Sequence, residues 1–254
     1  MVNTFGNNIV SAFTGGVPVK EIYNNGVKVW PVDTPTPTPL NNEIWYTTYS
    51  GNPITLTDAT KFGVNLVSNS YDSTKGVYVL EFDSVLTQTG TDSFKDITDL
   101  RSVQLPQTVK NIGLRTFFNS GLQSIIMPSV VTIYGLAFYK CSNLNPILIL
   151  PSTCKTFTGG GFGACFEYCS TLTDVTLPAV CEYLGPALFR YCSNLSNVTV
   201  NATTPPEMGS GQTGTYEQFT GCSSNLIIRV PNSSLQAYKT APVWSEYSDI
   251  IIGY

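Results

Sequence analysis

The sequence of 254 residues predicts a mainly β fold: a β-solenoid with N- and C-terminal caps, preceded by a small β-hairpin and a proline-rich linker. A short block recurs between residues 118 and 226, with an aromatic residue, a small-Cys-Ser step and a leucine. A β-branched strand that ends in proline usually follows each block. One such unit cannot bury its own apolar face, so repeats of this kind stack into a solenoid. The clearest copies of the block are residues 138–144, 166–172, 189–195 and 219–226.

The prolines that end the strands set the register of the repeats. They are Pro106, Pro128, Pro151, Pro178 and Pro231. The last interval is about twice as long as the others, which fits a period within the range typical of solenoids, and a strand at residues 197–200 fills its middle. Residues 94–100 are an early copy with Ile97 in place of cysteine. Six units therefore fit between residues 93 and 231.

This register assigns the repeated aromatic and leucine positions to the core. We expect stacked rings from Phe94, Phe118, Phe138, Phe166, Phe189 and Phe219. We expect a parallel row of leucines from Leu100, Leu122, Leu144, Leu172, Leu195 and Leu226.

The composition excludes several classes of function. Charged residues make up 12% of the chain, the net charge is -4, and no Lys/Arg cluster occurs, so a nucleic-acid partner is not expected. Histidine is absent, which excludes Ser-His-Asp and Cys-His nucleophiles and His-ligated zinc. No calcium loop, phosphate-binding loop or dinucleotide fingerprint is present. We therefore predict a protein that is not an enzyme, with no catalytic residue, metal or cofactor. Paired carboxylates of a glycosidase could still come from distant positions.

The N-terminal segment, residues 1–30, ends in a predicted hairpin. Alternating apolar residues flank the Asn25-Gly26 step, which suits a type I′ turn between strands at residues 19–23 and 27–30. A lone hairpin is marginal in water, so its apolar side chains require a partner. Either the hairpin covers the rest of this chain or it is a docking element for another protein. The candidate docking residues are Val19, Ile22, Tyr23, Val27, Val29 and Trp30.

The remaining segments have distinct expected roles. Residues 31–42 carry alternating prolines and are predicted to form an extended, semi-rigid Thr/Pro linker. Residues 43–92 are the expected N-terminal cap and residues 232–254 the C-terminal cap, the latter with a capped helical turn at residues 232–239. No signal-peptide pattern and no membrane span are found in the sequence as given.

Two insertions break the repeat period, around residues 159–163 and 205–218. Insertions in solenoids map to loops that often bind ligands, although flexible spacers would look the same in sequence. The candidate ligand-contact residues in these loops are Gly160, Phe162, Gln212 and Tyr216.

The repeat Ala137-Phe138-x-x-Cys141-Ser142-x-Leu144, followed by a strand ending in Leu-Pro, resembles the BspA-like leucine-rich repeat family. The resemblance covers roughly residues 43–254, including flanks that look like those of such arrays in Bacteroides-type bacteria and their phages. It implies a β-solenoid with an adhesive or partner-binding role, commonly at a cell surface. It implies no catalytic residue.

The resemblance also bears on the cysteines. Cys141, Cys169, Cys192 and Cys222 share the repeat position where such folds place a small residue that satisfies backbone groups inside the turn. We interpret them as small buried thiols. Cys154, Cys165 and Cys181 fall outside that position, and no C-x-x-C pair suggests a metal or redox site. Because seven is odd, at least one thiol stays free unless it pairs between chains.

A short hairpin, a Thr-Pro spacer and a binding solenoid together resemble a phage fibre or spike. We therefore expect a virion protein, associated with the head or the tail, that docks on other virion proteins through its N-terminus. Its solenoid would bind a glycan or protein of the host surface, and such fibres are often trimers, which leaves a homotrimer open. The alternative is a secreted or cell-surface adhesin of a Bacteroides-type bacterium. Carbohydrate cleavage by scattered carboxylates ranks third.

Overall fold

The computed structural model describes residues 37–56, 58–158, 163–209 and 217–254, and the backbone of the strands between residues 2 and 30. The chain divides into two compact units, Met1–Pro37 and Thr38–Tyr254. Each unit is described by itself.

The first unit contains only β-strands among its described residues. Three strands form an antiparallel sheet: β1 (Val2–Phe5), β2 (Asn8–Thr14) and β3 (Val17–Pro18). β4 (Ile22–Asn24) and β5 (Val27–Trp30) pair antiparallel on either side of positions 25 and 26, with Tyr23 opposite Lys28. Val19 lies outside the described residues, as do the side chains of the other candidate docking residues, so their docking role stays a prediction.

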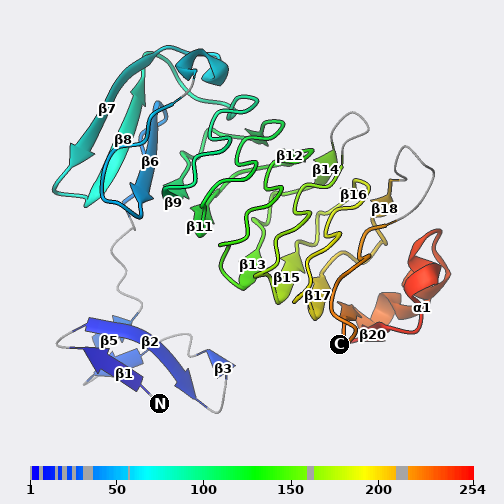
Figure 1. Ribbon diagram of the computed structural model, residues 1–254. Coiled ribbons are helices and arrows are strands. Elements are labelled where there is room, and N and C mark those ends of the chain that lie inside the picture. Colours follow the sequence, from blue (N-terminus) through cyan, green and yellow to red (C-terminus); the bar gives the residue numbers. More distant parts are fainter. Residues whose placement is uncertain are drawn as a thin grey trace. The chain divides into compact units, whose positions relative to one another are not determined.

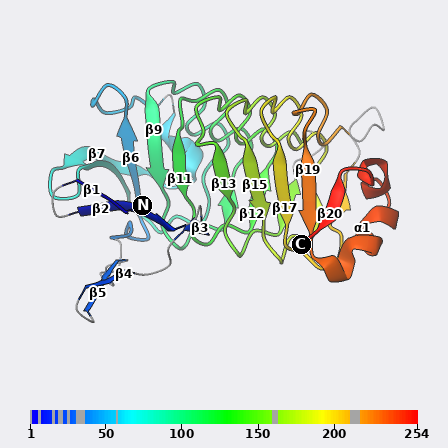
Figure 2. The same ribbon diagram turned by 90° about the horizontal axis from the view of Figure 1, so that it is seen from below.

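The second unit is the predicted β-solenoid (Figure 1). Two rows of short parallel strands run along it, and each strand pairs in register with the equivalent strand of the next coil, except between β11 and β13 of the first row. The strands of the first row lie side by side in Figure 2: β9 (Leu100–Gln104), β11 (Ser124–Ile126), β13 (Ile147–Ile149), β15 (Asp174–Leu177), β17 (Asn197–Val200), β19 (Ile227–Val230) and β20 (Ile251–Gly253). The strands of the second row are β10 (Asn111–Ile112), β12 (Thr132–Tyr134), β14 (Thr156–Thr158), β16 (Tyr183–Leu184) and β18 (Glu207–Met208).

A turn centred on a phenylalanine connects each strand of the second row to the next strand of the first row. In the coil of Phe138, three alternate residues donate backbone hydrogen bonds to the following coil: Leu136 to Gly163, Phe138 to Cys165 and Lys140 to Glu167, at 2.8–2.9 Å. The residues between them donate within their own coil instead, Ala137 to Tyr134 and Tyr139 to Leu136, so the backbone turns tightly here. Leu136 and Lys140 accordingly have positive φ angles of 57° and 58°.

This left-handed geometry recurs in successive coils although most of the residues are not glycine. The pairs that flank the phenylalanine turn are Asp92 and Asp96, Arg115 and Asn119, Ala164 and Tyr168, and Ala187 and Tyr191. A left-handed conformation costs a non-glycine residue roughly 1–2 kcal/mol. The hydrogen bonds between coils offset that cost, because each satisfies a buried backbone group.

The phenylalanine rings form a continuous buried stack, as the repeat predicts. Adjacent ring centroids lie 4.9–6.0 Å apart, with interplanar angles of 5–20°. The rings are those of Phe94, Phe117, Phe138, Phe166, Phe189 and Phe219. All six predicted leucines are also buried.

The predicted core position of Phe118 is wrong. Phe117 occupies the stack and is fully buried, whereas Phe118 is half-buried and stacks on Tyr139 outside the core. The reason is a shortened turn. Ser120 follows Phe117 at the spacing that Cys141 has from Phe138, but Leu122 follows Ser120 after two residues, whereas Leu144 follows Cys141 after three. Counting back from the leucine therefore shifts the assignment.

The N-terminal end of the solenoid is covered by antiparallel strands. β6 (Glu43–Thr48) lies between β9 and β8 (Val77–Phe82), and β7 (Leu66–Asp72) forms the sheet edge. A 3-10 helix, η1 (Ala59–Phe62), is capped by the Asp58 side chain and places Phe62 against Phe82 and Phe94. The first ring of the stack is thereby shielded from water.

The C-terminal end is covered by η2 (Asn232–Ser234), α1 (Leu235–Thr240) and η3 (Trp244–Tyr247). The helical turn was predicted, but its expected side-chain cap does not form, because η2 leads directly into α1 and the Ser234 amide donates to the Pro231 carbonyl. The Tyr238 hydroxyl donates to the Ala202 carbonyl at 2.8 Å, and the Trp244 indole donates to that of Pro206 at 2.7 Å. These bonds fix the cap to the last coils.

The register of the phenylalanine stack can be tested with adjacent substitutions. Phe117→Ala should lower the free energy of unfolding by about 3–5 kcal/mol, because it removes a fully buried ring between Phe94 and Phe138. Phe118→Ala should cost only about 1 kcal/mol, since its ring is half-buried. Urea unfolding monitored by circular dichroism measures both, and equal losses would contradict the register.

Candidate functional site

The four cysteines at the repeated position are structural. Each thiol donates to the carbonyl of the phenylalanine one coil earlier: Cys141 to Phe117 at 3.0 Å, Cys169 to Phe138 at 3.1 Å, Cys192 to Phe166 at 3.1 Å and Cys222 to Phe189 at 3.2 Å. This is the role expected of a small residue that satisfies the backbone inside the turn.

All seven cysteines are free. Burial raises the pKa of the Cys141, Cys154, Cys181 and Cys222 thiols to about 12, and it raises those of the other three as well. Because the thiolate is the reactive form, these side chains are poor nucleophiles in the folded protein. Cys222 alone is partly exposed.

The first strand row contains a break between β11 and β13. Elsewhere a residue at the start of each strand donates to the preceding coil: Gln123 to Arg101, Thr173 to Pro146 and Ser196 to Thr173. Pro146 occupies the equivalent position before β13 and has no N–H, so Asn145 donates to Gln123 instead. β11 and β13 consequently end two separate sheets.

Exposed isoleucines gather at this break. Ile126 ends β11 and is 52% exposed, while Ile147 and Ile149 of β13 are 63% and 71% exposed. A cavity of about 190 Å³ lies between the two strands, lined on one side by Ser124 and Ile125 and on the other by Ile147 and Ile149. A second cavity of about 160 Å³ lies on the other side of β11 and is also lined by Ser124 and Ile126. We call Ile126, Ile147 and Ile149 the isoleucine patch.

An external aromatic ladder runs beside the buried phenylalanine stack. Phe118 stacks on Tyr139, Tyr139 meets Tyr168 edge-on, and Tyr168 stacks on Tyr191, with centroids 4.7–5.5 Å apart. Lys95 lies over the first ring, and Gly221 packs against the last so closely that a Cβ there would lie 2.5 Å from Tyr191. The ring faces are thus occupied within the chain, so the ladder serves packing.

Ion pairs also connect successive coils. Arg115 pairs with Asp92 at 2.7 Å through two nitrogens, and its hydrogen bonds hold the pKa of that carboxyl below its usual value. Arg190 pairs with the buried Glu167 at 2.7 Å and with Glu217. These ion pairs join side chains of successive coils and so support their stacking.

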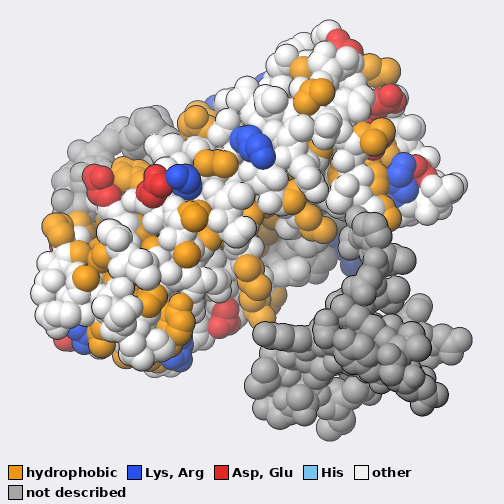
Figure 3. Space-filling model, turned by 180° about the vertical axis from the view of Figure 1, so that it is seen from behind, with side chains coloured by type: hydrophobic (Ala, Val, Ile, Leu, Met, Phe, Trp, Pro, Cys, Tyr) orange, Lys and Arg blue, Asp and Glu red, His pale blue; other side chains and the backbone are white. Residues whose placement is uncertain are grey.

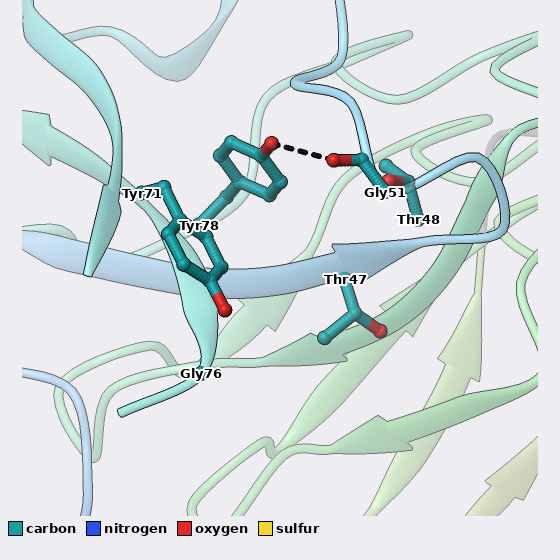
Figure 4. A pocket seen from close by; sticks show the side chains of 6 residues that line it. All are labelled: Thr47, Thr48, Gly51, Tyr71, Gly76 and Tyr78. Carbon is teal, nitrogen blue, oxygen red and sulfur yellow. Dashed lines mark hydrogen bonds between the residues drawn. The ribbon is translucent and has the colours of Figure 1, made fainter. Parts of the chain in front are cut away.

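A third cavity, of about 430 Å³, lies on the N-terminal sheet (Figure 4). Tyr71 and Tyr78 line it with Thr48, Gly51 and Gly76, and the Tyr78 hydroxyl donates to the Gly51 carbonyl at 2.7 Å. We call it the tyrosine pocket. Thr47 also lines it.

The sequence did not identify these surfaces. The candidate ligand-contact residues Gly160, Phe162, Gln212 and Tyr216 lie outside the described residues, so their role stays a prediction. For the isoleucine patch the sequence does contain a signal, which is Pro146 followed by Ile147 and Ile149. An exposed strand position rarely needs a large aliphatic side chain. The tyrosine pocket left no local signal, since its lining comes from three strands.

The described surface is poor in charge. Figure 3 shows one face on which the few charged side chains are scattered among uncharged polar and hydrophobic ones. Among the described residues, no group of three or more His, Cys, Asp or Glu side chains could hold a metal ion. Within the same part of the chain, no helix has the length and apolar character needed to cross a membrane.

Stacked parallel coils with a phenylalanine spine and a leucine row define a β-solenoid of the leucine-rich-repeat class, a fold that generally binds or scaffolds other molecules. A family model described as "BspA type Leucine rich repeat region" matches the chain in six copies, over residues 65–195 and 161–234, which is more than half of its length. The chain belongs to this family, as the sequence resemblance predicted. A search of curated proteins gave no match.

Three solved structures are similar to the chain. A Treponema pallidum leucine-rich repeat protein is 22% identical, with a TM-score of 0.47 over 66% of this chain and 77% of that one. The pneumococcal vaccine antigen PcpA is 19% identical, with a TM-score of 0.47 over 66% and 39%. A leucine-rich repeat protein from Bacteroides ovatus is 21% identical, with a TM-score of 0.38 over 67% and 51%. The matches thus span less than two thirds of the latter two proteins.

The raised thiol pKa values predict a loss of stability in alkali. In the unfolded chain a thiol ionises near pH 9.0, whereas in the folded chain Cys141 ionises at about 12. The stabilisation is therefore complete below about pH 9 and is lost as the pH rises towards 12, by about 1.4 kcal/mol per pH unit for each such thiol. Urea unfolding as a function of pH measures this slope.

Thiol titration gives the control for that prediction. All seven thiols should react with a disulfide reagent in denaturant, and Cys222 should react first in the folded protein. Cys141→Ser should reduce the alkaline slope by one thiol. A slope that the substitution leaves unchanged, or fewer than seven thiols in denaturant, would contradict the structural interpretation.

Proposed function

We propose that this protein is a non-enzymatic adhesion protein, without a cofactor, whose isoleucine patch binds a protein on a cell surface. The observation that carries the proposal is the exposure of Ile126, Ile147 and Ile149 around the break in the strand row. Exposed apolar clusters on a soluble protein commonly mark interaction sites.

Folding does not require these isoleucines. The next strand of the row, β15, carries polar residues at the same outward positions, because Asp174 pairs with Ile147, and Thr176 pairs with Ile149. The next coil continues with Asn197 and Thr199. Large aliphatic side chains at positions that tolerate Asp, Asn and Thr therefore indicate selection for contact with a partner.

The chemistry of the patch favours a protein partner. Its three side chains are aliphatic, and its two flanking cavities, of about 190 and 160 Å³, are each large enough for a side chain of a partner. Hot spots of protein interfaces form where a few anchors fill such pockets and exclude water.

The setting that we propose for this adhesion is a bacteriophage virion. The separation of the chain into a small β unit, Met1–Pro37, and the solenoid unit supports a fibre or spike with an anchor and a binding module. In this arrangement the first unit docks on other virion proteins of the head or tail, and the solenoid binds the host surface. A homotrimer is compatible with this proposal. The second candidate is a secreted or cell-surface adhesin of a Bacteroides-type bacterium, which family membership supports.

The role of the isoleucine patch in binding can be tested by replacing its isoleucines with the residues that the neighbouring coil carries at the same positions. The double variant Ile147→Asp and Ile149→Thr copies the outward residues of β15. It should weaken binding to intact cells of a Bacteroides strain panel at least tenfold, about 1.4 kcal/mol, because it removes the aliphatic contact. Flow cytometry of fluorescently labelled protein measures this.

The matched control places the same kind of change on the next coils. Thr176→Ala and Thr199→Ala should leave binding unaltered, and all variants should unfold within about 0.5 kcal/mol of the parent because the positions are at the surface. Protease treatment of the cells should abolish binding. Binding that survives protease, or that the double variant retains, would refute a protein partner at this patch.

The anchor can be tested by deletion. Removing residues 1–37 should leave a folded solenoid, since the first unit ends at Pro37 and the cap begins with Leu40, whose carbonyl accepts from Glu43. It should also prevent incorporation into phage particles. Mass spectrometry of purified virions and of bacterial envelope fractions measures where the full and shortened chains occur. Presence of the full chain only in the envelope would support the adhesin instead.

A further inference from the structure

We propose that the tyrosine pocket binds a neutral sugar residue. This site lies at β6, β7 and β8, in the same sheet as β11 of the isoleucine patch, and its ligand class goes beyond the proposed protein partner. Its cavity of about 430 Å³ falls within the range of roughly 300–1,000 Å³ that small-molecule sites occupy.

Tyr71 offers a ring that the other described residues leave more than half exposed. Tyr46, Tyr78 and Tyr71 lie in register across β6, β8 and β7. Tyr46 is buried and stacks on Tyr78, with the ring centroids 5.3 Å apart. The centroids of the Tyr78 and Tyr71 rings are 5.1 Å apart. Tyr71, at the end of this row, is 57% exposed and lines the cavity. The row therefore holds a rigid ring, while the external ladder of Phe118, Tyr139, Tyr168 and Tyr191 has its faces occupied.

The polar groups around the cavity suit hydroxyl groups of a ligand. Within the described residues, the Tyr71 hydroxyl makes no hydrogen bond and is free to donate and accept. The Gly51 carbonyl accepts one bond from Tyr78 and has a second lone pair. The Thr48 hydroxyl donates to the Asn52 carbonyl at 2.8 Å and can still accept. A pyranose presents such a combination, with an apolar C–H face for the ring and hydroxyl groups at its edge.

The ligand should carry no charge. Among the described residues, no Asp, Glu, Lys or Arg lines the cavity. The charged residues next to it, Asp72 and Lys75, pair with each other, and Lys75 lies over the Trp45 ring, which belongs to the opposite face of the sheet from Tyr46. An ionic ligand would find no counter-charge in the pocket.

Two glycines in left-handed conformation lie at the cavity wall. Gly51 and Gly76 have φ angles of +73° and +69°, and a Cβ at either position would meet no atom within 4 Å. Both turns thus place backbone without a side chain at the cavity wall. The ring of Tyr71 remains accessible from that side.

Saturation-transfer NMR on the full chain tests the proposal. The probes are the methyl glycosides of glucose, galactose, mannose and N-acetylglucosamine. At least one should bind, with an affinity that added salt does not change, because the interaction is uncharged. Tyr71→Ala should weaken that binding at least tenfold, about the effect expected for loss of a stacking ring. Tyr71→Phe should retain part of it, since stacking remains.

The matched control is Tyr134→Ala, which removes an exposed tyrosine of β12 in the other strand row. It should leave sugar binding unchanged, as should the isoleucine double variant, so that failure of one binding proposal is distinguishable from failure of the other. No binding of any of the four glycosides, or binding that Tyr71→Ala retains in full, would overturn the proposal.

Discussion

The fold depends on the hydrogen bonds that alternate residues of each phenylalanine turn donate to the next coil. They occur together with left-handed backbone on both sides of the phenylalanine, at residues such as Leu136 and Lys140, and they fix the distance between coils. That distance sets the spacing of the repeated side chains. The centroids of adjacent phenylalanine rings lie 4.9–6.0 Å apart, and the sulfur of each repeated cysteine lies 3.0–3.2 Å from a carbonyl oxygen of the preceding coil. Backbone strain is thus distributed over many residues and is offset locally in every coil.

The repeated interactions are the part of the structure that sequence could predict. Phe138, Leu144 and Cys141 recur at fixed spacing because each occupies one place in an identical coil. The prediction that Phe118 lies in the core was wrong for the same reason. The coil is one residue shorter between Ser120 and Leu122, so it keeps the geometry of the other coils but not their spacing in sequence. The candidate surfaces could not be predicted in this way. The tyrosine pocket arises from the antiparallel register of strands that are distant in sequence. The break at Pro146 arises because proline has no N–H to donate to the preceding coil, and the sequence alone does not show which residues pair between coils.

The break is informative because a parallel ladder has strong reasons to be continuous. Each interruption leaves two strand edges without partners, which in other proteins invites association with foreign strands. Here the Asn145 amide donates to the Gln123 carbonyl across the opening, and three isoleucines are exposed around it. A protein that avoided contact would place a charge there, as it places Asp174 on the next strand. Pro146 together with Ile147 and Ile149 therefore favours a surface for a partner over a defect in the solenoid.

The cysteines show how a repeated position can resemble chemistry without performing it. The same position holds Ile97 in the first coil, Ser120 in the second and cysteine in the following four. Its occupants share small or apolar character, and the cysteines add a donor that reaches the phenylalanine carbonyl one coil earlier. Serine could donate as well, but a thiol loses less on burial than a hydroxyl because it binds water more weakly. Burial then raises the pKa of the thiol and suppresses the thiolate. The features that make cysteine suitable for the coil are those that remove its reactivity.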